Sequence, residues 1–341
     1  MPIRAFENES EFVRWLRRIV PARRGRLKLG IGDDAALIGV GRGQELILTT
    51  DLSIEGVHYS PTIHPPRSVG HRALARSLSD IAAMGGTPRF ALISLAISRR
   101  TTRRWVEGFY AGLLDLAGRF GVAVIGGDTA IVPDRTVIDV IVCGEVPARR
   151  ALLRSGARPG DHIFISGRLG LSALGLRLLR ARRRPRRSAA PSPRLFAAAI
   201  RAHLYPEPQC ALGSFLARRR LASAMIDVSD GLSTDLAHLC AASSVGAWIG
   251  EELLPKPQPA DFGRAEQWDP TDLTLHGGED YQLLFTVPRG RVRQVPREFQ
   301  GMRLHWIGAI WVSKRVELLR PDGTHRRLEP GGWDHFRNPR D

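Results

Sequence analysis

The feature that most constrains the fold is the repeated alternation of helical and strand periodicity along both halves of the chain. Apolar residues recur with helical spacing, then gather in short β-branched runs, several times over. Such alternation builds sheets covered by helices, because each element must bury its apolar face against another. In the first half, the pattern predicts helices over 8–19, 68–84 and Thr102–Phe120, and strands over Glu45–Thr50, Phe90–Ile97, Val122–Ile125 and Thr136–Val142.

The second half repeats this pattern after a stretch rich in Gly, Pro and Arg at Pro147–Gly160. A chain of 341 residues is also too long for one ordinary core, which favours two domains. We expect them over 1–148 and 149–341, each a mixed α/β (α+β) fold. The second half is predicted to contain helices over 171–181, 194–203, 208–219 and 231–242, and strands over 161–166, 223–227 and near 281–287, 304–310 and 315–320.

The composition indicates a folded protein of a reducing compartment. The apolar fraction of 43% and the charged fraction of 25% are close to globular averages. The N-terminus has no apolar signal segment, and no apolar run approaches the roughly 20 residues of a membrane span. Three widely spaced cysteines, Cys143, Cys210 and Cys240, form neither a disulfide framework nor a zinc motif. The sequence therefore predicts a cytoplasmic protein with no membrane partner.

The formal charge of +16 raises the question of nucleic-acid binding. Nearly all of the basic residues are arginines, and we find no interleaved aromatic residues or recognisable nucleic-acid module. Nucleic acid is thus an unlikely main partner, and attraction of small anions is the milder consequence. The Arg180–Arg194 segment is expected to be a solvated loop, with a nucleic-acid arm as the alternative.

Acidic residues beside glycines or at strand ends are the main candidates for a functional site. Magnesium takes oxygen ligands, so several such carboxylates without matching lysines imply several ions. Any one of them alone is more often a turn former or a helix cap. Asp227 stands out because it ends an apolar strand, while Ser229 and Asp230 are expected to cap the helix that begins at Gly231. The segments are Gly32-Asp33-Asp34, Thr49-Thr50-Asp51, Ser79-Asp80, Gly126-Gly127-Asp128, Asp227-Val228-Ser229-Asp230-Gly231 and Gly277-Gly278-Glu279-Asp280.

The sequence gives weak signals, or none, for other phosphate-binding motifs. It has no P-loop motif and no protein-kinase signature. Gly167–Ser172 follows a strand and opens a helix, so it is either a phosphate-binding turn or a point of close helix–strand packing. His58 is either a general base or hydrogen-bond donor, or a structural residue.

Taken in order, these segments resemble the thiamine-monophosphate kinases, which share a superfamily with aminoimidazole ribonucleotide synthetase, selenophosphate synthetase and the hydrogenase maturation factor HypE. The resemblance runs nearly from end to end. It rests on Gly30-Ile31-Gly32-Asp33-Asp34, Thr49-Thr50-Asp51, Glu55-Gly56-Val57-His58, residues 78–85, Ile125-Gly126-Gly127-Asp128-Thr129, residues 154–161, residues 226–232, Gly277-Gly278-Glu279-Asp280-Tyr281 and Gly332-Trp333-Asp334-His335-Phe336.

The resemblance implies a two-domain aminoimidazole ribonucleotide synthetase-like fold and transfer of the γ-phosphate of ATP to thiamine monophosphate, giving thiamine diphosphate. The first domain would supply the ATP and magnesium site and form a homodimer, and the second would complete the active-site cleft. The positions that match magnesium ligands are Asp34, Thr49, Thr50, Asp51, Asp80, Asp128, Asp227 and Asp230. Those that match ATP contacts are Tyr110, Gly127, Asp128, Arg154 and Ser229, and those that match thiamine phosphate contacts are His58, Glu279 and Trp333.

Direct transfer between two polyanions needs charge neutralisation and alignment rather than a catalytic nucleophile. Trp333 would stack on the cationic thiamine ring, or else plug the C-terminus. Two other functions stay open as hypotheses. One is a sibling ATP-dependent synthetase such as aminoimidazole ribonucleotide synthetase, and the other is a basic nucleic-acid-binding protein with a vestigial site.

Overall fold

The computed structural model describes residues 15–16, 18–20, 27–29, 37–38, 40–181, 192–257 and 268–334. By its internal contacts the chain divides into two compact units. The first unit comprises Met1–Ile81 and Gly86–Arg149, and the second comprises Ala82–Gly85 and Arg150–Asp341. Within the described parts of the chain, no helix combines the length and apolar character that crossing a membrane requires.

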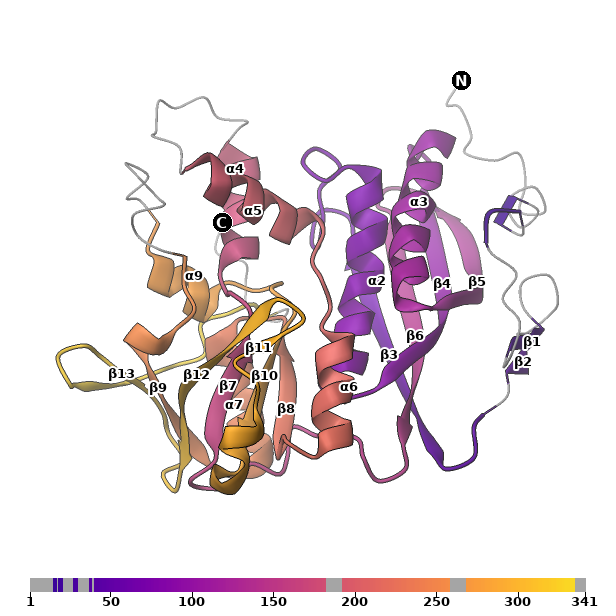
Figure 1. Cartoon of the computed structure of the whole chain (residues 1–341). Coiled ribbons are helices and arrows are strands. Elements are labelled where there is room, and N and C mark those ends of the chain that lie inside the picture. The colour runs from indigo at the N-terminus through magenta and orange to yellow at the C-terminus, as the bar shows by residue number, and fades with distance from the viewer. Residues whose placement is uncertain are drawn as a thin grey trace. The chain divides into compact units, whose positions relative to one another are not determined.

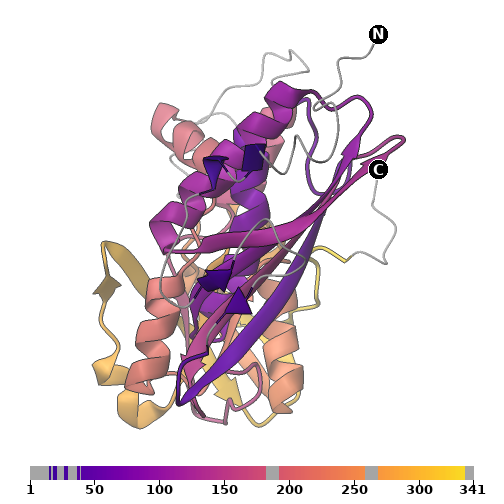
Figure 2. The ribbon, with the colours of Figure 1, turned by 90° about the vertical axis from the view of Figure 1, so that its right-hand side faces the viewer.

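A four-stranded sheet in the order β3-β6-β4-β5 forms the centre of the first unit. Its strands are β3 (Gln44–Ile54), β6 (Val137–Pro147), β4 (Thr87–Ser98) and β5 (Ala123–Val132). The helices α2 (Pro66–Ala83) and α3 (Arg103–Phe120) lie against one face of this sheet (Figures 1 and 2). Strands β4 and β5 are parallel because α3 connects them, whereas β6 is antiparallel to both of its neighbours.

Local sequence signals account for the ends of α3. The Thr102 side chain accepts a hydrogen bond from the amide of Trp105, which caps the first turn. Gly121 ends the helix in the left-handed conformation, with φ of 69°. The helix buries an apolar stripe that includes Val106, Phe109 and Leu113. The predicted helix over Thr102–Phe120 is thereby confirmed.

Three strands of the first unit extend well beyond their predicted ends. Strand β3 continues to Ile54, β6 continues to Pro147, and β5 runs through Gly126-Gly127-Asp128 as far as Val132. The sequence favoured a turn at the two glycines, but pairing with β4 holds this segment in the sheet. Strands β1 (Leu27–Leu29) and β2 (Leu37–Ile38) form a separate two-stranded pair. The helix predicted over 8–19 lies mostly outside the described residues.

The second unit is built on a sheet in the order β14-β13-β9-β12-β7-β10-β8, with the short β11 paired to β12. Its core includes Ile163, Ile226, Leu284 and Ile307, which are almost completely buried. The strands are β7 (His162–Ser166), β8 (Ala224–Val228), β9 (Gly246–Gly250), β10 (Gln282–Val287), β11 (Glu298–Phe299), β12 (Met302–Trp311), β13 (Val316–Leu319) and β14 (His325–Arg327).

The helices of the second unit agree with the sequence pattern to within a few residues, and α4 and α5 lie side by side (Figure 1). They are α4 (Leu171–Ala181), α5 (Pro193–Leu204), α6 (Cys210–Arg219), α7 (Leu232–Ser243) and α9 (Pro270–His276), with short 3₁₀ turns at Glu251–Leu253 and Arg289–Gln294. Helix α9 and strands β9, β11 and β14 were not predicted. Cys143, Cys210 and Cys240 are free and buried, as expected for small core residues.

Candidate active site

An acidic cluster in the first unit lies between β3 and α2. Alternation along β3 directs Thr49 and Asp51 to the face that the helices cover. The Thr49 hydroxyl donates a hydrogen bond to the Asp80 carboxylate. The Ser77 hydroxyl lies 3.1 Å from Asp51 Oδ2, and Arg76 Nη2 lies 3.6 Å from Asp51 Oδ1. The structure therefore brings together three of the predicted magnesium ligands, namely Thr49, Asp51 and Asp80.

The electrostatics of this cluster favour a bound cation. Burial, and then the negative charge of Asp80, raises the pKa of Asp51 to about 6, although Arg76 and Ser77 act in the opposite direction. Two carboxylates that repel each other are stabilised when a cation binds between them. The available donors are all carboxylate or hydroxyl oxygens, which is the donor set that magnesium prefers.

Thr50 points to the opposite face of the same sheet. Its hydroxyl donates a hydrogen bond of 2.5 Å to Asp139, which the sequence interpretation had missed. Ser94 pairs with both Asp139 and Asp128, so these three side chains lie on one face of the sheet. The predicted ligands Thr50 and Asp128 are therefore on one face, while Thr49 and Asp51 are on the other. Gly127, a predicted ATP contact, precedes Asp128 in β5.

His58 lies beside a small hollow in the first unit. Its Nδ1 accepts a hydrogen bond of 3.0 Å from the amide of Ile54. The hollow is lined by Ser53, His58, Tyr59, Val69, Arg72 and Arg76, and its enclosed part has room for about one water molecule. A predicted contact to thiamine phosphate thus lies beside two arginines that the sequence had not indicated.

Tyr110, a predicted ATP contact, is buried among aromatic rings. Its ring meets those of Trp15 and Phe109 edge to face, with centroids 5.4 Å and 5.2 Å away. Burial raises the pKa of its hydroxyl well above the usual value. In this conformation the ring packs in the core, and the proposed ATP contact remains a prediction.

Three separate segments of the second unit converge at the end of β8. The amide of Glu279 donates to the carbonyl of Ser229 at 2.7 Å, and the amide of Trp333 donates to the carbonyl of Asp230 at 3.0 Å. Asp227 is the buried residue of β8 that precedes this turn. These bonds bring together the predicted ligands Asp227 and Asp230, the predicted ATP contact Ser229, and the predicted substrate contacts Glu279 and Trp333.

Glycines permit this close approach of three backbones. A Cβ atom on Gly278 would lie 2.5 Å from the carbonyl oxygen of Ser229, and one on Gly332 would lie 1.9 Å from that of Asp230. Neither distance is sterically possible without movement of the backbone. Glycine at 278 and 332 is therefore explained by backbone contact rather than by flexibility.

The turn that carries Glu279 is strained. Glu279 and Tyr281 both adopt left-handed backbone angles, with φ of 63° and 50°. Between them, the buried Asp280 carboxylate accepts hydrogen bonds from the amides of Gly170, at 2.7 Å, and Ser172, at 3.2 Å. Those amides open α4, so the groups that a phosphate-binding turn at Gly167–Ser172 would need are occupied by Asp280. Burial raises the pKa of Asp280 to about 7.

The start of α7 is capped differently from the prediction. Gly231 is the N-cap residue, and the capping acceptor is Asp235, whose Oδ2 receives hydrogen bonds from the amides of Asp230, at 3.1 Å, and Gly231, at 3.0 Å. The predicted capping by Ser229 and Asp230 is therefore wrong, because the Asp235 carboxylate accepts these bonds. An acidic residue in the first turn of α7 was the signal that could have identified Asp235.

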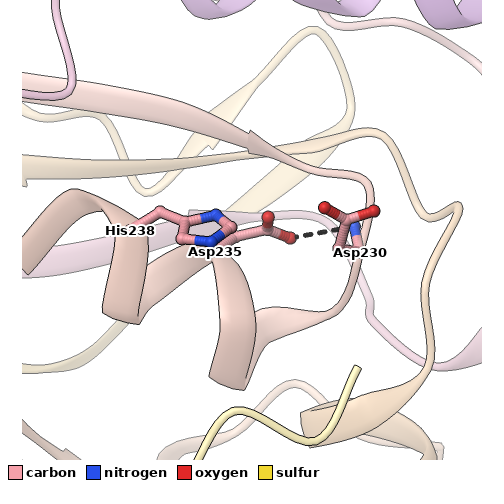
Figure 3. A group of neighbouring side chains, drawn as sticks. All are labelled: Asp230, Asp235 and His238. Carbon is pink, nitrogen blue, oxygen red and sulfur yellow. Dashed lines mark hydrogen bonds between the residues drawn. The ribbon is translucent and has the colours of Figure 1, made fainter. Parts of the chain in front are cut away.

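Asp230, Asp235 and His238 form a compact group (Figure 3). Their potential metal-ligating atoms lie within 4.8 Å of one another. Burial, followed by the charges of Asp227 and Asp230, raises the pKa of Asp235 to about 8. Because Asp235 Oδ2 already accepts two amide hydrogen bonds, we assign this residue to the support of the turn rather than to the ligands.

Other predicted site residues lie away from these groups or outside the described residues. Arg154 is exposed, and its carbonyl accepts a hydrogen bond of 2.9 Å from Ser243, at the end of the 12-residue α7 opposite to Asp230. Asp33, Asp34, His335, Phe336 and the centre of the Arg-rich segment lie outside the described residues.

Comparison with known proteins places this geometry in a family. A family model described as AIR synthase related protein, N-terminal domain, matches residues 32–146. The thiamine-monophosphate kinase of Bacillus subtilis (strain 168) is 35% identical over 314 residues, which is 91% of this chain and 94% of that protein. The thiamine-monophosphate kinase of Escherichia coli (strain K12) is 37% identical over 320 residues, which is 92% of this chain and 93% of that protein.

Solved structures agree with these sequence matches. The crystal structure of thiamine-monophosphate kinase from Stenotrophomonas maltophilia K279a has a TM-score of 0.78 at 32% identity, covering 92% of this chain and 96% of that one. The structure of AaThiL complexed with AMPPCP and TMP has a TM-score of 0.75 at 32% identity, covering 96% and 97%. The predicted aminoimidazole ribonucleotide synthetase-like fold is confirmed, and the chain belongs to the thiamine-monophosphate kinase family.

Proposed function

We propose that this chain transfers the γ-phosphate of ATP to thiamine monophosphate, giving thiamine diphosphate and ADP. The observation that carries this proposal is the similarity, over nearly the whole chain, to a kinase structure complexed with AMPPCP and TMP. The relatives that are 35–37% identical to this chain, over more than nine-tenths of its length, are both thiamine-monophosphate kinases. This disfavours the sibling synthetase.

Several magnesium ions are proposed as part of this site. The oxygen donors around Asp51 and Asp80 fit the hard cation, and Asp227 and Asp230 offer a second acidic group in the other unit. Bound magnesium would neutralise the phosphate charges during transfer. The full proposed ligand set is Asp34, Thr49, Thr50, Asp51, Asp80, Asp128, Asp227 and Asp230.

The remaining site residues bind and orient the two substrates. Gly127, Asp128, Arg154, Ser229 and Tyr110 are the proposed ATP contacts. His58, Glu279 and Trp333 are the proposed contacts to thiamine monophosphate. The attacking oxygen belongs to a phosphate monoester whose second pKa is about 6, so near neutral pH it needs no general base. Positioning and charge neutralisation are therefore the main tasks of the protein.

We also propose a homodimer formed through the first unit. The face of its sheet opposite α2 and α3 exposes three large apolar side chains, Leu46, Leu48 and Leu52. An apolar surface of this kind commonly marks an interface. In the proposed division of roles, residues 1–148 supply the dimer contacts and most of the metal ligands, and 149–341 supply the rest of the site. Three free cysteines accord with a cytoplasmic location.

A direct assay of product formation tests the proposed activity. Purified protein with ATP and magnesium should convert thiamine monophosphate to thiamine diphosphate, measured by chromatography after oxidation to fluorescent thiochromes. Asp51→Asn should lower kcat/KM on the order of 10²-fold, because it removes a charged metal ligand. Asp115→Asn is the matched control, since Asp115 pairs with Arg67 on the surface. It should leave the rate unchanged.

Measurements with other ligands separate the alternatives. Turnover with formylglycinamidine ribonucleotide and none with thiamine monophosphate would contradict the proposal in favour of the sibling synthetase. Salt-dependent RNA binding with no ATP chemistry, unaffected by Asp51→Asn, would support the nucleic-acid hypothesis.

A further inference from the structure

Arg76 contacts the proposed metal site from α2. Its Nη2 lies 3.6 Å from Asp51 Oδ1, and both side chains are largely buried, at 17% and 21% exposed. The other carboxylate oxygen, Oδ2, accepts a hydrogen bond from Ser77, whose hydroxyl lies 2.9 Å from the carbonyl of Val140 as well. Both oxygens of Asp51 are therefore engaged by the protein itself. A metal ion that binds Asp51 must compete with the Arg76 guanidinium for the same negative charge.

Arg76 also lines the hollow beside His58. Arg72 lines this hollow too, is only 4% exposed, and places Nη2 3.4 Å from the carbonyl of His58. The Tyr59 hydroxyl lies near Thr136 but makes no hydrogen bond of good geometry among the described residues, and Tyr59 is 3% exposed. The hollow thus combines two guanidinium groups and a buried phenol. These are groups that recognise a phosphate.

Metal binding changes the electrostatic balance of Arg76. A divalent cation on Asp51 neutralises the carboxylate and repels the nearby guanidinium. The most favourable new partner for that guanidinium is an anion at the opening of the hollow that Arg76 already lines. Arginine is suited to this exchange because its planar fork binds phosphate oxygens in pairs.

We propose that Arg76 couples metal binding to phosphate binding. In the metal-free protein it holds Asp51, and when a divalent ion takes Asp51 it turns to a phosphate group bound at the opening of the hollow that Arg72 and His58 line. This inference rests on the proposed magnesium site at Asp51. Because such coupling is reciprocal, the ion strengthens phosphate binding by the same factor that phosphate strengthens binding of the ion.

Direct binding measurements on the full chain test the coupling. Mn²⁺, a paramagnetic substitute for magnesium, is titrated without substrates and followed by its electron paramagnetic resonance signal. The part of the binding that Asp51→Asn removes identifies the site. At that site, Arg76→Gln should tighten Mn²⁺ binding several-fold, because the competing cation is gone. The control Arg67→Gln removes another ion-paired arginine from the same helix and should change nothing.

Calorimetry supplies the second measurement. In the unmodified protein, magnesium should strengthen the binding of thiamine monophosphate by about tenfold, within the range usual for coupled sites. In Arg76→Gln, binding should be weaker and no longer respond to magnesium. Arg76→Lys keeps the charge but loses the fork, so it should retain the weak Mn²⁺ binding and lose part of the phosphate affinity. Parallel titrations with AMPPCP show whether the phosphate is that of the acceptor or of the nucleotide.

The outcomes separate this inference from the proposed site. Mn²⁺ binding that persists unchanged in Asp51→Asn would overturn the magnesium site and the coupling with it. Binding that depends on Asp51 but is identical in Arg76→Gln, with the response of both phosphate ligands to magnesium intact, would overturn the coupling alone. Matching circular dichroism spectra and melting curves ensure that the variants compared are folded.

Discussion

Replacing Gly332 with alanine tests whether Trp333 is held rigidly in the second unit. The new Cβ would lie 1.9 Å from the carbonyl oxygen of Asp230. To reach an ordinary contact of 3.4 Å, the chain at 332–333 must move by about 1.5 Å. That movement breaks two hydrogen bonds, from Gly332 N to Thr234 Oγ1 at 3.1 Å and from Trp333 N to Asp230 O at 3.0 Å.

Two lost bonds of about 1 kcal/mol each weaken the docked state by about 2 kcal/mol. If Trp333 contacts thiamine monophosphate only when docked, the KM for that substrate should rise by about 30-fold. The measurement is steady-state kinetics with varied thiamine monophosphate at saturating ATP. Gly290→Ala is the control, because its Cβ would have no neighbour within 4 Å. An unchanged KM in Gly332→Ala, beside a raised KM in Trp333→Ala, would refute the rigid docking.

Two further predictions concern assembly and stability. Leu48→Glu places a charge on the exposed apolar face of the first unit and should convert the proposed dimer to a monomer in light scattering, whereas Val312→Glu, at an equally open position in the second unit, should not. Asp235 has a folded-state pKa raised to about 8 from 3.8, so its favourable contribution to stability is lost as the pH rises through this range. In metal-free buffer, the unfolding free energy of the unmodified protein should therefore fall by about 3–4 kcal/mol between pH 5 and 8. Asp235→Asn keeps the oxygen acceptor but does not titrate, so it should not show this fall. Parallel pH curves for the two proteins would contradict the prediction.

The long elements could be predicted from the sequence because their periodicity extends over many residues. Helix α3 is a clear case, since an apolar stripe, a Thr cap and a terminal Gly all give the same bounds. Strand β5 shows the limit of such signals. Its two glycines favoured a turn, and only its pairing with β4, from a distant part of the chain, keeps Asp128 within the sheet.

The sequence indicated which residues could form the candidate site, but not where their side chains lie in the structure. Adjacent residues Thr50 and Asp51 appeared to belong to one motif, yet strand alternation directs them to opposite faces. Arg76 gave no signal because its partner, Asp51, lies 25 positions away on another element. Asp235 was missed because its carboxylate binds the backbone of a turn, and its only sequence signal was its place in the first turn of α7.

The strained turn at Glu279 also bears on how freely this chain could be made more stable. A non-glycine residue with left-handed angles costs about 1–2 kcal/mol, and Glu279 and Tyr281 both carry that cost. A sequence selected for stability alone would place glycine at such positions. Because a carboxylate is retained there, the free energy of the folded state already includes the cost of holding it in one fixed direction before any ligand binds. If Glu279 binds the substrate as proposed, the turn is a position where gains in thermal resistance and in substrate recognition oppose each other.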